Sequence, residues 1–423
     1  MSLVTEIERP NSFVFRRAAI QRRSATTGLY DGVWRDISSL VRQWGAIENG
    51  VDDVRFNRIT HSGINLTVDN DSGSFNHHSN ASSLWFGFLN RYRTLVRIQA
   101  GYYDTNLTSE LPTDPTLGVF VLDSEISIKS TTNDVYLRCA SLKSIFDEVR
   151  ARDILRLFTS TVWTASQIVE VVRDHSDGSG TNVFREFITS TSWTITATTN
   201  NYLLTTTVLE EKTTWALMET LAEAEGYVIM ITRAGGIEFR PRTARQASSQ
   251  FSFVGQTFSR PNIIQIDEYK EAWDKYYTYY RLKYLEADTS TSFVTAGTTT
   301  VLNASNVSWA YGSRVYEFEN RLPQNTASAQ AIVDNLFSLS TSVPVDLTQK
   351  CLFIPQLDVL DRIDVSYRSY DLANQSLWGV FVWGRDRWAQ EGVNFEFSTQ
   401  AFFVISQKHD LNTFSTTFKL RQI

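Results

Sequence analysis

The chain has 423 residues, of which 42% are hydrophobic and 20% are charged, and a formal net charge of −6. This composition excludes general disorder. The length predicts two or more domains, because one hydrophobic core rarely serves so many residues. The mild negative charge argues against a surface for duplex DNA, which needs clustered Lys and Arg. The 26 Phe, 17 Tyr and 11 Trp predict a mainly β protein, since aromatic side chains suit a pleated, half-buried surface.

Three classes of feature are not expected. No run of about 18 apolar residues occurs, so we expect no stable membrane insertion. The first residues include Glu6, Glu8 and Arg9 and lack the apolar core of a signal peptide, which predicts a protein that stays in the cytoplasm where it is made. Cys139 and Cys351 each lie in an apolar, strand-like run, and we expect buried free thiols rather than a disulfide.

The first third of the chain predicts strands. Residues 1–30 carry five arginines without clear periodicity and are interpreted as an N-terminal arm that orders on assembly; an edge strand at Ser12–Phe15 is the open alternative. Residues 31–140 alternate short apolar segments with turns, which indicates a first β-barrel or sandwich. The expected strands include Ile64–Val68, Leu95–Ala100, Gly118–Leu122, Ile126–Ile128 and Val135–Cys139.

The pattern changes to α+β over residues 141–255. Apolar spacing predicts helices at 141–149 and 166–173, and a third at 213–225 with Gly226 as its C-terminal cap. A β-hairpin is expected to follow, with strands at 227–231 and 237–240. These residues are interpreted as a central α+β domain.

Strands return over residues 256–423, which predict a second barrel. An aromatic strand is expected at Lys275–Leu285, and an inserted helix at 326–339. The fold class predicted from the sequence is therefore mainly β with an α+β insert, in which two similar tube-like β-barrels flank the central domain.

The chain also contains an internal repeat. Phe120-Val-Leu and Val135-Tyr-Leu-Arg align with Phe403-Val-Ile and Phe418-Lys-Leu-Arg at a constant offset of 283 residues. The second copy would hold a longer loop that includes Gly384–Gly392, which is tolerated because closure entropy grows slowly with loop length. The alternative is that two hairpins agree by chance. The repeat predicts that Phe120 and Phe403 are equivalent, as are Leu137 and Leu420.

Candidate metal and nucleophile sites are weak. His77 and His78 could join Asp69 and Asp71 around a divalent ion, but adjacent residues of a strand point to opposite faces. The segment His175–Gly180 combines His, Asp and Ser without the strand-turn-helix elbow that nucleophilic catalysis uses. We expect polar loops at both places, and no catalytic, cofactor-binding or metal-binding residue.

Two further candidates concern sugars. The carboxylate pairs Glu317/Glu319 and Asp358/Asp361 could suit glycoside hydrolysis, but a sequence does not show the required separation, and carboxylates at turns are commoner. A run with Trp378, Trp383 and Trp388 could form a sugar-stacking platform. Core or interface packing is the preferred interpretation of these tryptophans.

Three segments resemble the hub proteins of tailed-bacteriophage baseplates and tail tips, which are related to VgrG-type spikes. The helix ending Leu221-Ala-Glu-Ala-Glu-Gly226 and its hairpin resemble the family's central domain. The pattern Leu-x-x-x-Asp-x-Ile-x-Val, here at 357–365, precedes a closing hairpin as in the family's final barrel. Residues 65–101 resemble the first barrel. The resemblance covers roughly residues 30–423, and no lysozyme, peptidase or spike domain follows, so a cell-wall-degrading role is not expected.

The resemblance implies a structural virion protein, not an enzyme, that is assembled in the host cytoplasm and located at the tail tip. It would cap the hexameric tail tube as a homotrimer, by threefold-to-sixfold matching, and form part of the genome-ejection channel. Distal tail or tube proteins, the tape-measure protein and tail fibres or spikes would be partners, with DNA only in transit. A receptor- or carbohydrate-binding tail module is the alternative, and a polysaccharide-degrading tail enzyme is a third possibility.

Overall fold

The computed structural model is mainly β, as the composition predicted. It describes residues 7, 12–23, 30–52, 58–76, 81–85, 89, 94–104, 106–123, 126–129, 131–155, 162–175, 184, 187–188, 192–204, 209–210, 212–245, 248–255, 263–286, 290–297, 314–323, 325–337, 343–370 and 393–422.

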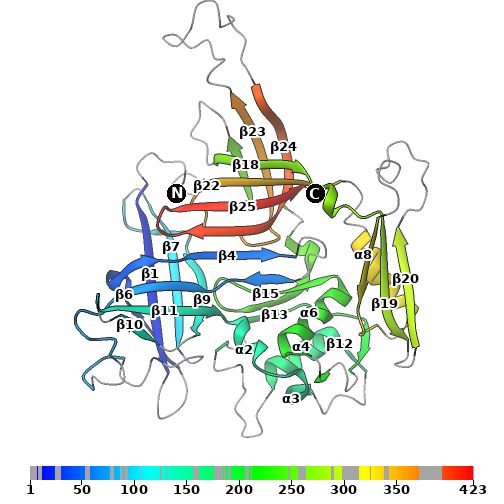
Figure 1. Ribbon diagram of the computed structural model, residues 1–423, viewed down its shortest axis with the longest axis horizontal. Helices are drawn as coiled ribbons and strands as arrows, with labels where there is room; N and C mark the ends of the chain where they lie inside the picture. The colour runs from blue at the N-terminus through cyan, green and yellow to red at the C-terminus, as the bar shows by residue number, and fades with distance from the viewer. Residues whose placement is uncertain are drawn as a thin grey trace, which may run out of the picture.

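The first sheet has the strand order β2-β1-β7-β9-β11-β6-β3, with β8 paired to β7 and β10 paired to β11 (Figure 1). Its strands are β1 (Val14–Arg23), β2 (Tyr30–Asp36), β3 (Val41–Trp44), β6 (Ile64–Asp69), β7 (Leu95–Tyr103), β8 (Glu110–Leu111), β9 (Thr116–Leu122), β10 (Ser127–Lys129) and β11 (Asp134–Ser141). A short 3-10 helix, η1 (Ser38–Leu40), leads into β3.

The interpretation of residues 1–30 as an arm is wrong for β1. This strand pairs with β7 from Val14 to Gln21, so it is not an arm. In the described residues β2 pairs with it only from Ala19 onward, so Val14 and Phe15 lie at an edge of the sheet, as the alternative of an edge strand at Ser12–Phe15 predicted. Ala18 and Ile20 are buried in the core beneath the sheet. The arginines obscure this strand in the sequence because Arg16 interrupts the face that holds Ala18 and Ile20: it lies over Trp44 at 5.2 Å, whereas Arg17, on the opposite face, forms an ion pair with Glu110 at 2.5 Å.

The second sheet has the order β17-β23-β24-β25-β22-β18. Its strands are β17 (Phe251–Gly255), β18 (Ile263–Glu271), β22 (Val345–Leu352), β23 (Arg362–Tyr370), β24 (Val393–Asp410) and β25 (Ser415–Gln422). Two strands from early in the chain join it: β4 (Ala46–Val51) pairs with β24, and β5 (Ile59–His61) pairs with β4. The predicted boundary of the first barrel at 31–140 therefore cuts across the fold, because the chain crosses between sheets at Gly45.

The same topology occurs twice in the chain. Six strands of each sheet follow one another in the same spatial order, β1-β7-β9-β11-β6-β3 in the first sheet and β17-β23-β24-β25-β22-β18 in the second. In both sets, the strands at these places also occur in the same order along the chain. The outermost pairs differ, since β1 is antiparallel to β7 whereas β17 is parallel to β23. In the described part of the chain neither sheet closes on itself, so the two closed barrels expected from the sequence are not found.

The residue correspondence predicted from the repeat is wrong by one or two positions. The β10–β11 hairpin closes with Lys129 opposite Asp134, and the β24–β25 hairpin with Asp410 opposite Ser415. Each turn ends on a left-handed residue, Asn133 (φ 51°) or Phe414 (φ 47°). The register therefore places Leu137 with Phe418, not with Leu420.

Across the next strands, Phe120 lies opposite Val96 and Ser141, and Phe402 lies opposite Ile363 and Gln422. Phe120 therefore corresponds to Phe402, not to Phe403. The two-residue difference between Leu420 and Phe418 leaves the same face of the strand buried, so the hydrophobic pattern did not distinguish those two alignments. The one-residue difference at Phe402 lies beyond the register shift between Val404 and Ser406 in β24.

The central part contains the predicted helices and hairpin. Its elements are α2 (Lys143–Asp147), α3 (Ala151–Leu155), α4 (Ala165–Asp174), α6 (Thr214–Glu225), β12 (Val162–Thr164), β13 (Trp193–Ile195), β14 (Asn201–Leu203), β15 (Tyr227–Ile231), β16 (Ile237–Pro241) and the 3-10 helix η4 (Arg242–Arg245). Thr164 caps α4 through a capping box with Gln167, and Thr213 caps α6. Gly226 ends α6 in the left-handed conformation, as predicted.

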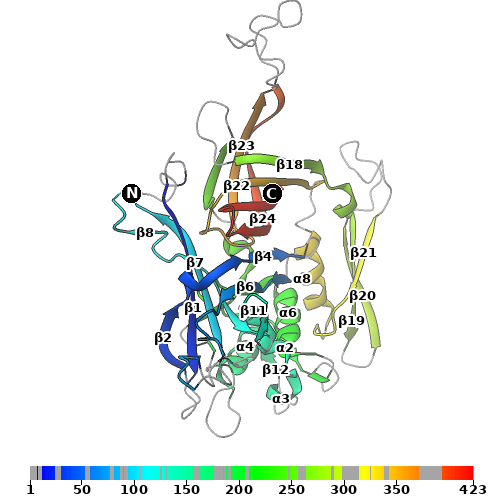
Figure 2. The same cartoon turned by 60° about the vertical axis from the view of Figure 1, so that its left-hand side comes forward.

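Part of the predicted second barrel packs on this central part instead. A separate sheet follows the 3-10 helix η5 (Trp273–Lys275) in the chain and consists of β19 (Tyr279–Glu286), β20 (Ser290–Gly297) and β21 (Val315–Glu319). The helix α8 (Thr326–Phe337) lies beside α6 (Figure 2). Tyr280, Leu282 and Ile332 share one hydrophobic core with α6. A second core lies between the two large sheets and holds both cysteines, which are buried and free as expected.

Candidate functional site

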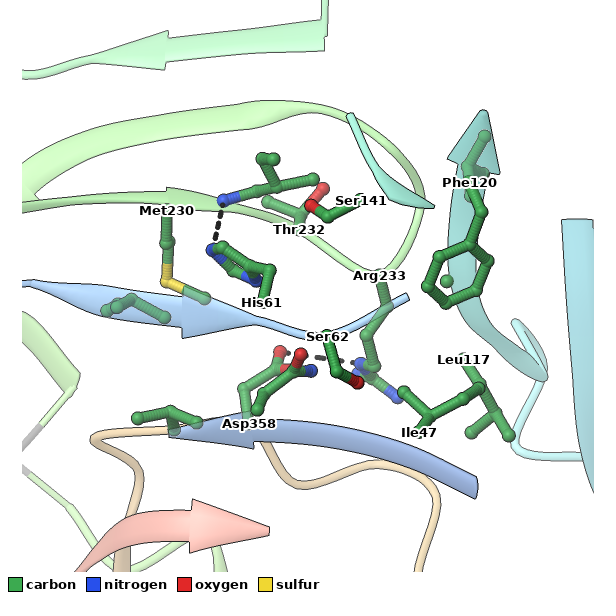
Figure 3. A pocket seen from close by; sticks show the side chains of 16 residues that line it. Ile47, His61, Ser62, Leu117, Phe120, Ser141, Met230, Thr232, Arg233 and Asp358 are labelled. Atoms are coloured by element: carbon green, nitrogen blue, oxygen red, sulfur yellow. Dashed lines mark hydrogen bonds and ion pairs between the residues drawn. The ribbon is translucent and has the colours of Figure 1, made fainter. Parts of the chain in front are cut away.

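A small cavity lies where β9, the β15–β16 hairpin and the loop before β23 meet (Figure 3). Its walls also include residues of β4 and β5, so all three parts of the chain contribute to it. The cavity volume is about 30 Å³. One water molecule needs roughly 10–15 Å³ of such space, so the cavity suits two or three waters and is too small for an organic substrate.

The tip of the β15–β16 hairpin reaches across this junction. Arg233 donates a hydrogen bond from Nη1 to the carbonyl oxygen of Pro355 at 2.5 Å, and its Nε lies 3.4 Å from Oδ2 of Asp358. Gly235 has φ +84°, and a Cβ atom there would lie 3.0 Å from Cβ of Val119 in β9. The turn therefore requires glycine both for its conformation and for its close approach to the first sheet.

Asp358 and Asp361, considered above as a possible catalytic pair, have structural partners. Asp361 accepts a hydrogen bond from the backbone N–H of Asp358 at 2.8 Å through Oδ2. Asp358 pairs with Arg233 as described, and both aspartates are less than a tenth exposed. Leu357 and Ile363, from the same sequence pattern, are fully buried. The residues of the Leu-x-x-x-Asp-x-Ile-x-Val pattern therefore form the loop before β23 that binds Arg233.

His61 lies against the cavity and links β5 to the central part. Its Nε2 accepts a hydrogen bond from the backbone N–H of Ile231 at 3.3 Å, and its ring lies edge-on to Trp215 at 6.4 Å. Burial lowers the pKa of His61 to about 4, so the ring is neutral at pH 7 and keeps an accepting nitrogen. His409 in β24 lies 3.0 Å from Thr416 through Nδ1, and burial lowers its pKa to about 4 as well.

These two histidines predict acid sensitivity. Their folded-state pKa values lie below the unfolded value of about 6.5, so the unfolded chain binds more protons between pH 6.5 and 4. Their stabilising effect is complete above pH 6.5 and is lost as the pH falls towards 4, by about 3 kcal/mol for each ring. We expect the free energy of unfolding, measured by urea titration from pH 7.5 to 4.5, to fall less steeply in His409→Gln than in the wild type. Equal slopes would contradict a buried neutral His409.

The other sequence candidates do not converge on a site. Arg42 pairs with Asp69, Asp71 and Asp134 at 3.0 Å each, so the acidic turn is occupied by a guanidinium. His77, His78 and Asp177 lie outside the described residues, and so does the tryptophan run 378–388. His175 is the C-terminal cap of α4.

The remaining carboxylate pair lies on a charged outer face. Glu317 pairs with Arg281 at 3.4 Å, and Glu319 pairs with Lys283 at 3.6 Å and Arg321 at 2.7 Å. Among the residues that the structure describes, no three His, Cys, Asp or Glu side chains gather closely enough to hold a metal ion. In the same part of the chain, no helix is both long and apolar enough to cross a membrane.

Sequence patterns do not predict one buried ion pair. Arg421 in β25 donates to Asp346 in β22 from Nε and Nη2, at 2.8 and 3.0 Å. The side chains are 6% and 1% exposed, and Lys275 of η5 lies 3.7 Å from the same carboxylate. The pair therefore joins the second sheet to the segment that leads into β19.

Solved structures with a similar fold are known, although sequence comparisons find no match. No protein-family model matches the chain, and no curated protein matches it. Among solved structures, the tail protein from Neisseria meningitidis MC58 matches with a TM-score of 0.53 and 9% identity, covering 96% of each chain. This likeness is one of fold: the chain shares the fold of that structure over almost its whole length.

Two further structures match with lower scores. Prophage tail protein gp18 from Listeria monocytogenes EGD-e has a TM-score of 0.49 and 11% identity, covering 95% of this chain and 94% of its own. The 43 kDa tail protein of prophage MuSo2 from Shewanella oneidensis has a TM-score of 0.49 and 10% identity, covering 96% and 98%.

Proposed function

We propose that this chain is a structural protein of a bacteriophage tail, and specifically a hub of the baseplate or tail tip. The fold shared with a tail protein supports the tail role. The observation that carries the hub role is the repeated six-strand topology within one chain. The junction cavity is too small for a substrate, and its polar residues bind one another, so the proposal includes no catalytic step.

The repeated topology offers a way to match symmetries. A tail tube built from hexameric rings presents six equivalent positions. A chain with two similar sheets fills two positions, so three chains complete the ring as a homotrimer. Its channel would pass the genome during ejection, and exposed strand edges would be covered by neighbouring chains.

The proposed partners are distal tail or tube proteins on one face of the ring, together with the tape-measure protein and tail fibres or spikes. The proposed location is the tail tip of the virion, after assembly in the host cytoplasm. The β15–β16 hairpin is joined to the loop before β23 by the Arg233–Asp358 ion pair and approaches Val119 of β9 at Gly235, so it would keep the two sheets of each chain in a fixed relation. A rigid unit suits a part that serves as a template for a ring.

Cryo-electron microscopy of the tail that contains this chain tests the proposal. We expect three copies around the tail axis, with both large sheets of every chain facing a central channel. Six copies, or a ring in which only one sheet of each chain reaches the channel, would refute the symmetry argument. A chain found at the tube wall or in a peripheral fibre would refute the hub assignment altogether.

A further inference from the structure

The repeated topology also indicates how one copy contacts the next. Inside the chain, the two halves are joined by strand pairing: β4, which continues from β3, pairs antiparallel with the end of β24. Residues 46–50 of β4 lie opposite residues 410–406 of β24, with Ile47 opposite His409 and Ala46 opposite Asp410. If the two halves are copies, each side of this contact has a counterpart elsewhere in the chain.

The counterpart of the end of β24 is β10. Both strands form the first arm of a hairpin with a four-residue turn. When the closing pairs of the two hairpins are aligned, Lys129 corresponds to Asp410 and Ile128 to His409. One edge of β10 pairs with β11; no strand in the described part of the chain pairs with its other edge. Ser127, Ile128 and Lys129 are all exposed, Ile128 to 44%.

The counterpart of β4 is the second half of β18. In the first sheet, Trp44 pairs with Leu66, and Leu66 pairs with Leu137 on its other side. In the second sheet, Ile266 pairs with Gln349, and Gln349 pairs with Phe418 on its other side. Phe418 is the counterpart of Leu137. Trp44 therefore corresponds to Ile266. An irregularity follows each of these residues, namely the break at Gly45 between β3 and β4 and a bulge between Ile266 and Glu268 in β18. Counting residues across it, Ile47 corresponds to Tyr269 and Ala46 to Glu268. In the described residues β18 ends the second sheet, and residues 267–271 are exposed along it.

We infer that β18 of one copy pairs antiparallel with the free edge of β10 of another copy, so that Ile128 lies opposite Tyr269 and Lys129 opposite Glu268. This register follows from the β4–β24 pairing and from the residue count across the bulge in β18. It nevertheless brings together two exposed apolar side chains, Tyr269 being 37% exposed, and two opposite charges. β10 and β18 lie far apart in one chain (Figure 1), so this pairing requires two chains.

The contact is head-to-tail, because each copy offers a different strand on each side. Repetition of such a contact gives a closed ring or an open filament, depending on the rotation between copies. Backbone pairing at an exposed edge also explains how polar backbone groups of β10 and β18 are satisfied in the assembly. The inference deepens the proposed hub role, since it names the surface through which the ring would form.

Engineered cysteines test this contact, because the native Cys139 and Cys351 are buried. Ile128→Cys and Tyr269→Cys are prepared as separate chains with different tags, mixed at high concentration and oxidised. We expect a disulfide between unlike chains and none between like chains. Val315→Cys, a similarly exposed residue on β21, is the matched control. Cross-linking no greater than this control, or a chain that sediments as a monomer at every concentration, would overturn the inference; a 128–128 or 269–269 disulfide would do so too.

A charge swap gives a second measurement. Lys129→Glu should weaken self-association about tenfold in sedimentation experiments, and Glu268→Lys in the same chain should restore it. If the swap does not restore association, the proposed register is wrong. The double variant Ile128→Cys/Tyr269→Cys separates this inference from the hub proposal. Oxidation to a closed covalent trimer supports both, whereas a ladder of longer species supports the strand contact and contradicts the threefold ring.

Discussion

Leu221→Asp is expected to unfold the central part of the molecule. Leu221 is fully buried in α6, in the core that also holds Trp215 and Ile332. A carboxylate there loses its hydration and gains no partner, so we expect a loss of ~4 kcal/mol or more in the free energy of unfolding. Urea or thermal denaturation of the purified variant measures the effect.

Ala216→Asp provides the control, because it adds the same charge to the same helix at a partly exposed position. It should cost less than about 1 kcal/mol, since surface substitutions away from special features have small effects. If Leu221→Asp unfolds at the same denaturant concentration as the wild type, α6 is not the centre of this core.

Local patterns predicted this region well. The helix 213–225, its glycine cap and the following hairpin depend on residues close in sequence, and Gly226 adopts the expected left-handed conformation. The sequence predicts one buried apolar face for α6, but a larger part of the helix surface is buried. Thr214, Thr220 and Glu223 of α6 are buried as well, because α2, α3, α4 and α8 pack around the helix in addition to the hairpin and cover sides that an isolated helix would expose to water.

The errors came from long-range pairing. The sequence around β1 does not show that β7, some eighty residues later, pairs along its length. Nor does it show that the chain leaves the first sheet at Gly45, so that β4 pairs with β24. The helix at 326–337 was predicted correctly, but its neighbours are α6 and β19, and the strand order of the second sheet does not include it. Strand and helix propensities carry no information about such partners.

The candidate site was predicted least well, for the same reason. His61, Arg233 and Asp358 come from three separate segments and meet only in the folded chain. The one available signal for His61 was the alternation in Ile59-Thr-His61, which places His61 on the same side of β5 as the buried Ile59. For Arg421, the only signal in the sequence is its place at the end of the repeated Leu-Arg pair. Its partner Asp346 lies in a different strand.

Arg421→Met is the second change with a large expected effect. The Arg421–Asp346 pair is almost fully buried, and removing the guanidinium leaves a carboxylate that cannot reach water. Breaking such a pair typically costs about 3–5 kcal/mol. Lys275, 3.7 Å from the same carboxylate, offsets part of this loss, so we expect a value near the lower end. Arg138→Met is the matched control: Arg138 lies on the equivalent strand β11 but is exposed, and its loss should change stability by less than about 0.5 kcal/mol.

A double-mutant cycle separates the buried charge from lost packing. Asp346→Leu in the Arg421→Met background removes the unpaired carboxylate, and burying apolar groups in place of an ion pair is often neutral or stabilising. We therefore expect the double variant to recover most of the stability that Arg421→Met loses, with a coupling of more than 2 kcal/mol between the two positions. Additive effects would mean that Arg421 stabilises β25 through the packing of its side chain alone.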